Sequence, residues 1–446
     1  MPKPEHKCRI FLGLIEIAGH YRALTDAFRQ LGHKATFVDM YGNRNCYESR
    51  SRNNLLLHLI DYLVMKRQKC RGRWAGRAWR ALLILLQPLL FVYAVCTHDV
   101  FILGHNTTFM GPMDLCLLKL CGKRIIAQFH GTDGRLRYID AYFQNNAEKP
   151  DVTRLARHTR KQRRIIRSID RWADVVVNIG PQGHLHTRPF VQWLRVGLPS
   201  SQSRQPMPSS DKRDSGAPVR ILHCPSNPIG KGTAIIRDLV AKAREIRSIE
   251  YVEVIGQPNS VVMDELRKCD FVIDQVYADY GMAGFATEAA WLGKPALVGG
   301  LAVDYWKQEL CESLRPPSLY CYPKQMYEMM LKLIDDEEFR LELGRKARAF
   351  VESSWHPIKV AQKLLLALDN KLSPDWYVEA ADISYIAGWG MPPERLKDIV
   401  SRMVRKHGIE SLCVGDKPKV QSLFERLING QPLPPETGLA DLTRTQ

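Results

Sequence analysis

The chain has 446 residues, of which 45% are hydrophobic and 25% are charged, and its formal net charge is +17. This length exceeds one ordinary core, so we expect two or three domains, and the composition excludes wholesale disorder. The eleven cysteines form no CxxC pair, which argues against a disulfide framework and a zinc site and favours a cytosolic protein with reduced thiols.

The first half alternates short apolar runs with helical stretches. A turn at Gly19 opens the first helix, which ends at Gly32, and Glu16 interrupts an apolar run that is too short for a signal peptide. We expect strands at residues 8–14, 34–39, 100–104, 124–129 and 175–179. This alternation predicts a mostly parallel sheet with helices on both faces.

The positive charge is concentrated in two segments. Residues 66–80 hold seven Lys and Arg residues and no acid, and residues 154–171 hold eight against one acid, so together they carry +14 of the +17. We therefore expect two local surfaces that face something anionic.

An apolar stretch at residues 81–97 follows the first basic segment. It is slightly short for a membrane span, and Gln87 and Pro88 interrupt it. The preceding basic and aromatic residues predict a helix lying on an anionic membrane surface. They are Arg73, Trp74, Arg77 and Trp79. The alternative is a buried core helix that leads into the strand starting at Val100.

The second basic segment is expected to be one amphipathic helix. Its arginines recur every three or four residues and fall on one face: Arg154, Arg157, Arg160, Arg164, Arg167 and Arg171. A solvated face would normally mix charges of both signs, so an anionic lipid surface or a phosphate-bearing acceptor explains the pattern better. A solvated outer face is the alternative.

The second half repeats the strand and helix alternation after a Ser- and Pro-rich linker. We expect strands at 220–223, 251–255, 271–275 and 296–298, and helices at 233–247, 261–269, 285–292, 324–368, 393–407 and 419–428. The domains are then 1–195, a linker at 196–218, 219–370, and a helical extension at 371–446. The predicted fold class is α/β, with two Rossmann-like doubly wound domains facing each other across a cleft, where ligands bind at the carboxyl ends of the strands.

Two motifs of the second half suit a nucleotide. The run HCPSNPIGKGTAII, at 223–236, ends a strand, presents Lys231 and opens a helix, so backbone N–H groups and a cation are available to a diphosphate. In YGMAGFATEAAWLGKPALVGG, at 280–300, Gly281 and Gly284 precede a helix that carries Glu288, whose carboxylate can accept hydrogen bonds from ribose hydroxyls. The alternatives are a plain turn with a solvated lysine and an acid that merely favours a first helical turn.

The run from Lys231 to Gly300 resembles the donor-binding half of GT-B glycosyltransferases of the family-four-like type. The resemblance implies that Lys231 binds the donor diphosphate and Glu288 the donor ribose. Other implied donor-binding residues are Ser226, Asn227, Gly232, Gly281, Gly284 and Phe285. The first glutamate of the family's motif is absent, because Tyr280 stands in its place beside Asp279, and the family's arginine ahead of the lysine is also missing.

The first half resembles the same family. The loop QFHGTDGRLRY, at 128–138, is similar to an HGSD-R loop, which implies that His130 and Asp133 are catalytic and lie near the transferred sugar. Arg135 or Arg137 would face the donor or acceptor. Gly19 would let the backbone approach the diphosphate.

No DxD triplet occurs, so we expect no metal and no cofactor, with the leaving charge met by Lys231, arginines and helix dipoles. The resemblance implies a retaining hexosyltransferase that uses a nucleotide-sugar donor. We expect a lipid-linked or envelope-polysaccharide acceptor and peripheral attachment to the inner face of the cytoplasmic membrane. The alternatives are a sugar-nucleotide epimerase of the same fold and a nucleic-acid-binding protein, although no recognised binding motif supports the latter. The sugar, the base and the oligomeric state are left open.

Overall fold

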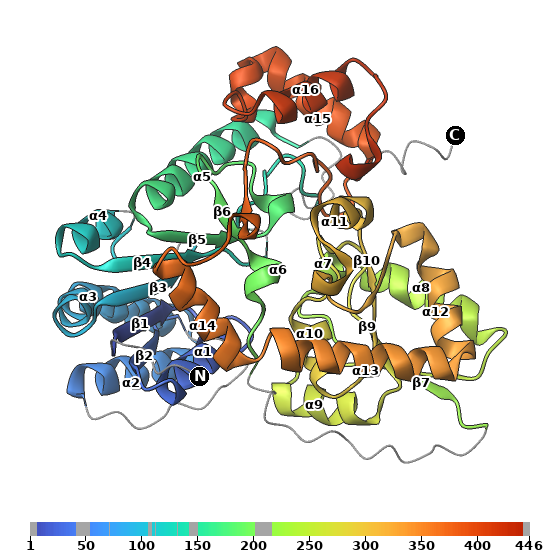
Figure 1. Cartoon of the computed structure of the whole chain (residues 1–446), viewed down its shortest axis with the longest axis horizontal. Helices are drawn as coiled ribbons and strands as arrows, with labels where there is room; N and C mark the ends of the chain where they lie inside the picture. Colours follow the sequence, from blue (N-terminus) through green and yellow to red (C-terminus); the bar gives the residue numbers. More distant parts are fainter. Residues whose placement is uncertain are drawn as a thin grey trace.

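Two separate sheets, each flanked by helices, organise the chain in the computed structural model (Figure 1). The structure describes residues 7–41, 54–70, 72–105, 109–111, 113–131, 133–141, 150–200 and 216–439. The first sheet has the order β12-β6-β5-β4-β3-β1-β2, and the second has the order β11-β10-β9-β7-β8. All pairings are parallel except the one between β12 and β6.

The strands are short and mostly buried on both faces, as parallel strands between two helical layers must be. Those of the first sheet are β1 (Arg9–Leu14), β2 (Lys34–Asp39), β3 (Val100–Gly104), β4 (Arg124–Gln128), β5 (Val175–Asn178), β6 (Phe190–Gln192) and β12 (Tyr377–Val378). Those of the second are β7 (Val219–His223), β8 (Ile249–Glu253), β9 (Phe271–Ile273), β10 (Ala296–Gly299) and β11 (Leu319–Cys321).

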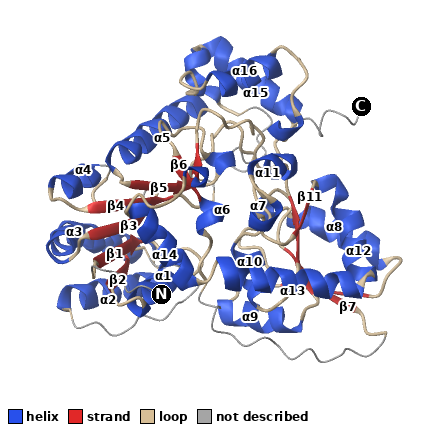
Figure 2. Ribbon diagram, viewed as in Figure 1, coloured by secondary structure: helices blue, strands red, loops and turns tan. Residues whose placement is uncertain are grey.

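Helices cover both sheets (Figure 2). The first domain carries α1 (His20–Gln30), α2 (Leu55–Lys69), α3 (Arg73–Thr97), α4 (Met113–Leu120), α5 (Val152–Trp172) and α6 (Trp193–Val196). The second carries α7 (Pro228–Lys231), α8 (Thr233–Arg244), α9 (Asn259–Lys268), α10 (Gly284–Trp291), α11 (Val303–Glu309), α12 (Met326–Asp335) and α13 (Glu337–Ser354). The remaining helices are α14 (Pro357–Leu368), α15 (Pro393–His407) and α16 (Pro418–Ile428).

The predicted fold class is confirmed, because both halves form doubly wound parallel sheets. The expected strands 34–39 and 100–104 have the predicted bounds, and the other expected strands differ by a few residues at their ends. The sequence did not indicate β6, β11 and β12, which are only two or three residues long. Most of the predicted linker, residues 201–215, lies outside the described residues.

The chain returns to the first domain earlier than the expected boundary at residue 370. Helix α14 packs against α1, and Arg124 of β4 binds the backbone oxygen of Leu368 and the carboxylate of Asp369, the latter at 3.0 Å. Val360 and Leu364 on the inner face of α14 are fully buried, so the apolar face of this helix completes the core of the first domain. In Figure 1 this orange helix lies among the blue helices of the first domain.

The C-terminal extension also belongs to the first domain. Strand β12 pairs with β6, and α15 packs against α5. The Tyr138 hydroxyl, which is buried below α16, donates a hydrogen bond to the backbone oxygen of Leu412 at 3.0 Å. The ring of Phe424 from α16 lies edge-on to the ring of Tyr138, at a centroid distance of 5.4 Å. The extension therefore covers the end of the first sheet.

Helix α3 packs by one face only. Leu83, Leu90 and Ala94 are buried, whereas Leu85 and Val92 are more than half exposed. Within the described chain, Trp74–Thr97 is one helix that is long and apolar enough to cross a membrane by length and composition, and 28% of its most apolar window is buried. As the core-helix alternative expects, α3 leads into β3 and buries one face in the core, but its other face is exposed.

Candidate functional site

The turn that follows β7 positions Lys231. Asn227 caps the short helix α7 by accepting a hydrogen bond from the Gly230 N–H at 3.0 Å, and Ser226 is exposed beside it. The ammonium of Lys231 lies 2.9 Å from Oδ1 of Asp274, a fully buried carboxylate directly after β9. The next position, Gly232, requires a glycine, because its φ is +73° and a Cβ there would lie 2.7 Å from Cγ2 of Val276.

Glu288 lies close to the same carboxylate. It follows the start of α10 by one turn and accepts a hydrogen bond from Nδ2 of Asn259 at 3.1 Å. Burial and, to a smaller extent, the neighbouring charge of Asp274 raise the pKa of Glu288 to about 7, against the hydrogen bond from Asn259. Lys231 and Glu288, from two separate motifs, therefore converge around Asp274 at the carboxyl end of the second sheet.

The start of α10 meets the first domain. A Cβ at Gly284 would lie 3.7 Å from Cβ of Ala18, in the loop between β1 and α1. Ala18 and Gly19 both have left-handed backbone conformations, with φ of 48° and 79°. Phe285 is half-buried against the main core. Gly281 lies where a Cβ would approach the Ser318 hydroxyl to 2.6 Å. The predicted glycine loops of the two domains are thus brought together.

His130 belongs to a group of aromatic rings at the end of β4. Its Nε2 is 3.1 Å from the Tyr21 hydroxyl, and its ring lies 4.7 Å from the ring of His20. Burial and the neighbouring His20 hold the pKa of His130 well below its ordinary value, and burial lowers the pKa of His20 to about 4. Both imidazoles are therefore neutral at pH 7. They can exchange hydrogen bonds but carry no charge.

Asp133 forms a hydrogen bond within its own loop. Its Oδ2 accepts a hydrogen bond from the backbone N–H of His130 at 3.1 Å, so the carboxylate fixes the position of the histidine. Burial raises the pKa of Asp133 to about 6, against the opposing charge of Arg137. Arg137 is half-buried, and burial lowers its pKa although Asp140 and Asp133 oppose this.

Arg135, which the resemblance places toward the donor or acceptor, is buried where the two domains meet. Its side chain is 2% exposed and is held by Asp140 at 2.7 Å and by Asp279 of the second domain. The guanidinium also lies 5.5 Å from the ring centre of Trp389 in the C-terminal extension. The two carboxylates accept hydrogen bonds from the two terminal nitrogens of the guanidinium.

Asp279 is equally enclosed. Gln182 donates to its Oδ2 at 2.8 Å, and the hydroxyl of Tyr385 donates to its Oδ1 at 3.4 Å. The carboxylate of Asp279, which stands beside the position of the family's missing sugar-contacting glutamate, is therefore engaged within the protein. Together with Arg135 it joins the two domains.

Several residues of this region were not predicted from the sequence. Glu16 accepts hydrogen bonds from the backbone N–H groups of Ile17, Tyr21 and Arg22 at 2.9, 3.1 and 3.2 Å, and so occupies the start of α1. Burial raises its pKa to about 7. The sequence did contain a signal that could have identified Asp274, because a carboxylate directly follows an apolar strand there. His20 and Tyr21 could have been identified as two polar rings directly after a glycine turn.

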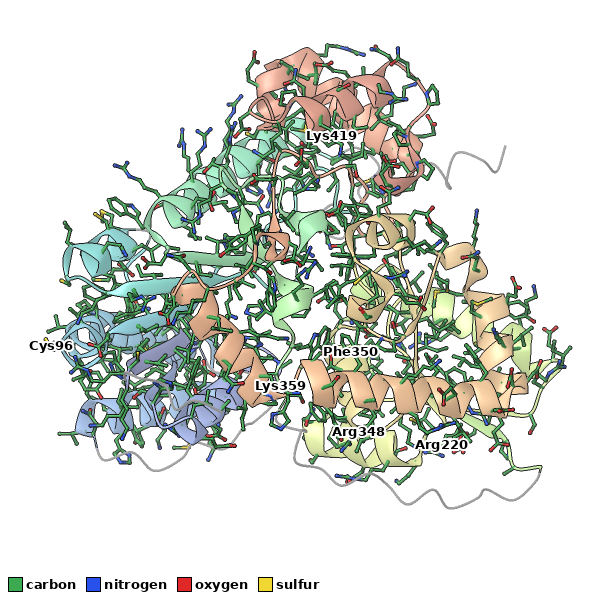
Figure 3. All side chains as sticks on the ribbon, viewed as in Figure 1. Cys96, Arg220, Arg348, Phe350, Lys359 and Lys419 are labelled. Atoms are coloured by element: carbon green, nitrogen blue, oxygen red, sulfur yellow. The ribbon has the colours of Figure 1, made fainter. Side chains whose placement is uncertain are left out.

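The basic surfaces have the predicted exposure. The six arginines named for α5 are all exposed, while Leu155 and Ile169 are buried and Ile165 and Trp172 are half-buried. Figure 3 shows nitrogen-tipped side chains rising from the outer face of α5. On α3, Trp74 is 79% exposed with Arg77 stacked 5.0 Å from its ring centre, and Trp79 is half-buried. The side chain of Arg73 lies outside the described residues.

No family model and no curated protein matches the chain. Among solved structures, it is similar to HepE of Anabaena in complex with UDP, with 11% identity, 81% of this chain and 100% of that chain covered, and a TM-score of 0.46. It is also similar to the glycosyltransferase VinC in complex with DTDP, with 13% identity, the same coverages and a TM-score of 0.40. The glycosyltransferase SnogD of Streptomyces nogalater gives 14% identity, the same coverages and a TM-score of 0.38.

The buried ion pairs of Arg135 predict a large loss of stability when the guanidinium is removed. Arg135→Met leaves Asp140 and Asp279 buried without their partner, which should lower the free energy of unfolding by about 3–5 kcal/mol. Adding Asp140→Asn and Asp279→Asn should recover most of this loss. The control is Arg345→Met, which breaks an exposed ion pair with Glu342 and should cost less than about 1 kcal/mol. Equal urea midpoints for the two arginine variants would contradict the assignment.

The raised pKa of Glu288 predicts a pH-dependent gain on substitution. The folded protein holds this proton up to about pH 7, whereas the unfolded chain releases it near pH 4.5, so stability falls as pH rises through this window. Above pH 7, Glu288→Gln should therefore have a free energy of unfolding about 1–3 kcal/mol higher than that of the wild type, and a higher melting temperature. Below pH 4.5 the two proteins should be equally stable.

The control is Glu265, whose pKa is shifted in the opposite direction. Hydrogen bonds from Lys268 and Arg220 lower the pKa of Glu265, so Glu265→Gln should lose stability at neutral pH. A thermal melt series over pH 4–8 measures both variants, and a Glu288→Gln protein that is less stable at pH 8 contradicts the prediction.

Proposed function

We propose that the protein is a GT-B-type glycosyltransferase of the hexosyltransferase class, which moves a sugar from a nucleotide-diphosphate sugar to an acceptor. One observation carries the proposal. Lys231 and Glu288 converge around Asp274 at the carboxyl end of one parallel sheet, and the Gly19 loop of the other sheet lies against the start of α10. A cation, a helix start and an acid at such a position suit a diphosphate and a ribose.

The donor is bound mainly by the second domain in this proposal. The ammonium of Lys231 has three donors, so it can keep its contact with Asp274 and still bind a phosphate oxygen. The N–H groups at the start of α10 and the left-handed backbone at Gly19 lie beside that phosphate. Glu288 accepts hydrogen bonds from the ribose hydroxyls, which favour its ionised form.

The proposed reaction is retaining and needs no metal. The bond between the anomeric carbon and the β-phosphate oxygen breaks, and the acceptor oxygen bonds to the same face of that carbon. The acceptor proton passes to the departing phosphate oxygen. Lys231 and the dipole of α10 stabilise the leaving charge. Neutral His130, held by Asp133 and Tyr21, binds a hydroxyl of the transferred sugar.

The acceptor and the location follow from the exposed surface. The arginine face of α5 and the exposed apolar face of α3, with Trp74 and Arg77 at its start, fit peripheral attachment to an anionic membrane. We therefore place the protein on the inner face of the cytoplasmic membrane. Its acceptor is lipid-linked or an envelope polysaccharide.

The donor site predicts a nucleotide-dependent thermal shift. One of UDP, GDP and ADP should raise the melting temperature of the wild type, because a ligand that binds only the folded state stabilises it. Glu288→Gln should weaken the binding by at least about tenfold, the effect of losing hydrogen bonds to a charged group. Lys231 is tested as Lys231→Met with Asp274→Asn, because the single change leaves a buried carboxylate without its partner.

The control for this experiment is Lys307→Met on α11, a change to an exposed lysine paired with Asp304. It should keep the full shift. If no nucleotide stabilises the wild type, or if both site variants keep the shift, the assignment is contradicted. Release of nucleoside diphosphate only when acceptor is added identifies a transferase, whereas conversion of the donor without acceptor identifies the epimerase alternative.

The arginine face of α5 predicts salt-sensitive binding to anionic vesicles. Replacing Arg157, Arg160, Arg164 and Arg167 by Gln should weaken co-sedimentation by at least about tenfold at low salt, because each charge near such a surface contributes about 1 kcal/mol. Replacing Lys242, Lys307, Arg345 and Lys346 removes the same charge elsewhere and should have a smaller effect. Preference of the wild type for RNA or DNA over vesicles would support the nucleic-acid alternative instead.

A further inference from the structure

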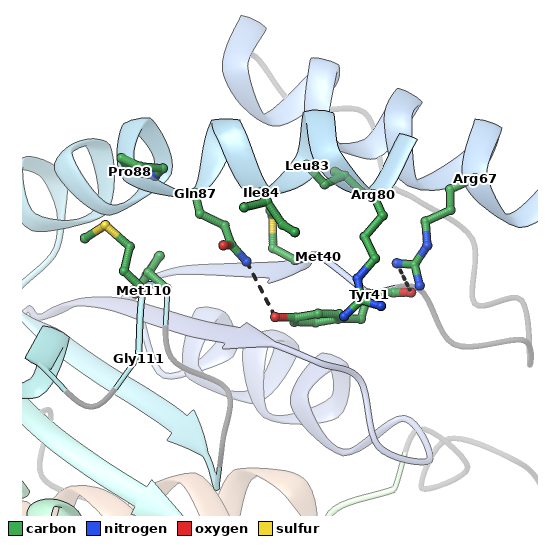
Figure 4. A pocket seen from close by; sticks show the side chains of 11 residues that line it. Met40, Tyr41, Arg67, Arg80, Leu83, Ile84, Gln87, Pro88, Met110 and Gly111 are labelled. Carbon is green, nitrogen blue, oxygen red and sulfur yellow. Dashed lines mark hydrogen bonds between the residues drawn. The ribbon is translucent and has the colours of Figure 1, made fainter. Parts of the chain in front are cut away.

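A pocket of about 500 Å3 lies at the end of β2, within the range of cavities that hold small ligands. Its walls come from residues 40–41, from α2 and α3, and from residues 109–111 (Figure 4). Arg67 of α2 and Arg80 of α3 both line it. We call this cavity the arginine pocket.

The walls of the arginine pocket combine apolar and polar side chains. Met40, Leu83 and Phe109 are buried side chains that line it. Its polar groups other than the arginines are Gln87 and Tyr41. Nε2 of Gln87 lies 3.5 Å from the Tyr41 hydroxyl, which is a long hydrogen bond for a buried amide. A ligand group that accepts from Gln87 would therefore displace only a weak contact.

The two guanidinium groups have no carboxylate partner within the part of the chain that the structure describes. Among the described residues, Arg67 donates only to the backbone oxygen of Tyr41, at 3.3 Å, and Arg80 is exposed at the pocket. Two planar forks of N–H donors beside each other match the oxygens of a phosphate better than those of any neutral group. The pocket therefore favours an anion at one end and an apolar group along its wall.

The apolar surface continues outside the pocket. Leu82, Leu85, Leu89 and Val92 recur at helical spacing along the outer face of α3 and are 44%, 70%, 57% and 59% exposed. Ile84, which lines the pocket, is itself 51% exposed. An acyl or prenyl chain that leaves the pocket would thus meet an unbroken apolar face, which a free phosphate does not need.

The arginine pocket lies beside the proposed catalytic cleft. Strand β2 pairs in parallel with β1 up to the contact of Leu14 with Asp39. The pocket and the loop that carries Glu16 and Gly19 therefore both lie at the carboxyl-terminal ends of these strands. His130 follows β4 at the same end of the sheet. A ligand headgroup in the pocket is therefore one strand away from the loop that meets α10.

We propose that the arginine pocket binds the phosphate head of a lipid, with Arg67 and Arg80 on the phosphate oxygens and the chain along α3. Given the proposed glycosyl transfer, this lipid phosphate carries the acceptor. The role as acceptor rests on that function, but the binding itself does not. The pocket thus selects a phosphate-headed lipid, whereas the arginines of α5 attract any anionic surface.

The test uses calorimetric titration of the full chain with dihexanoyl phosphatidic acid and, separately, with inorganic phosphate. The wild type should bind the lipid at least about tenfold more tightly than the ion. Arg67→Gln with Arg80→Gln should weaken lipid binding by at least about tenfold, the loss expected for charge-assisted hydrogen bonds to phosphate. Ile84→Ser should weaken binding of the lipid but not of inorganic phosphate.

The matched control is Arg345→Gln with Lys346→Gln on α13, which removes two exposed charges far along the chain and should leave lipid binding unchanged. Equal loss in the control and the pocket variant, or full binding in the pocket variant, overturns the proposal. Equal affinity for lipid and inorganic phosphate indicates a simple anion site and also overturns it. The nucleotide shift is measured on the same proteins. Its absence from the wild type contradicts the glycosyltransferase and leaves the lipid result standing.

Discussion

A buried ion pair joins the two domains, between Arg135 of the first and Asp279 of the second, whose side chains are 2% and 1% exposed. A second carboxylate, Asp140, and the ring of Trp389 complete the surroundings of the guanidinium. Charges this deeply buried are tolerated only with close partners, so a shift that parts Arg135 from Asp279 while either stays buried would leave an uncompensated charge. The contact therefore favours the observed position of one domain against the other.

Burial also sets the charges on the two sides of the cleft. On the first domain it keeps His20 and His130 neutral, because the pKa of each imidazole lies below its ordinary value. On the second it brings the pKa of Glu288 to about 7, close to physiological pH. In the proposed function, hydrogen bonds from the ribose hydroxyls favour the ionised form of this acid, which burial makes costly to ionise.

The sequence predicted both parallel sheets because hydrophobic periodicity and turn residues are local signals. It singled out Lys231 and Glu288 because one lies in a turn before a helix and the other in the first turns of a helix that follows a glycine loop. It did not predict the role of Arg135, whose partner Asp279 lies far away in the chain, since a basic residue in a cleft loop looks the same whether it is free or enclosed. The return of α14 to the first domain was missed for a similar reason. An amphipathic helix records that one face is buried but not which core it joins.

The pairing of β12 with β6 has a consequence for how the protein folds. The edge of the first sheet, and the cover that α15 places over α5, come from residues synthesised after the whole second domain. During synthesis, the strand β6 at the edge of the first sheet and part of the apolar surface of the first domain therefore stay uncovered until these residues emerge from the ribosome. An uncovered edge strand and apolar surface favour pairing with other chains. Such long-range closure is slow, because distant segments must meet before either is stabilised. The protein should thus rely on chaperones during synthesis more than its two independent sheets suggest.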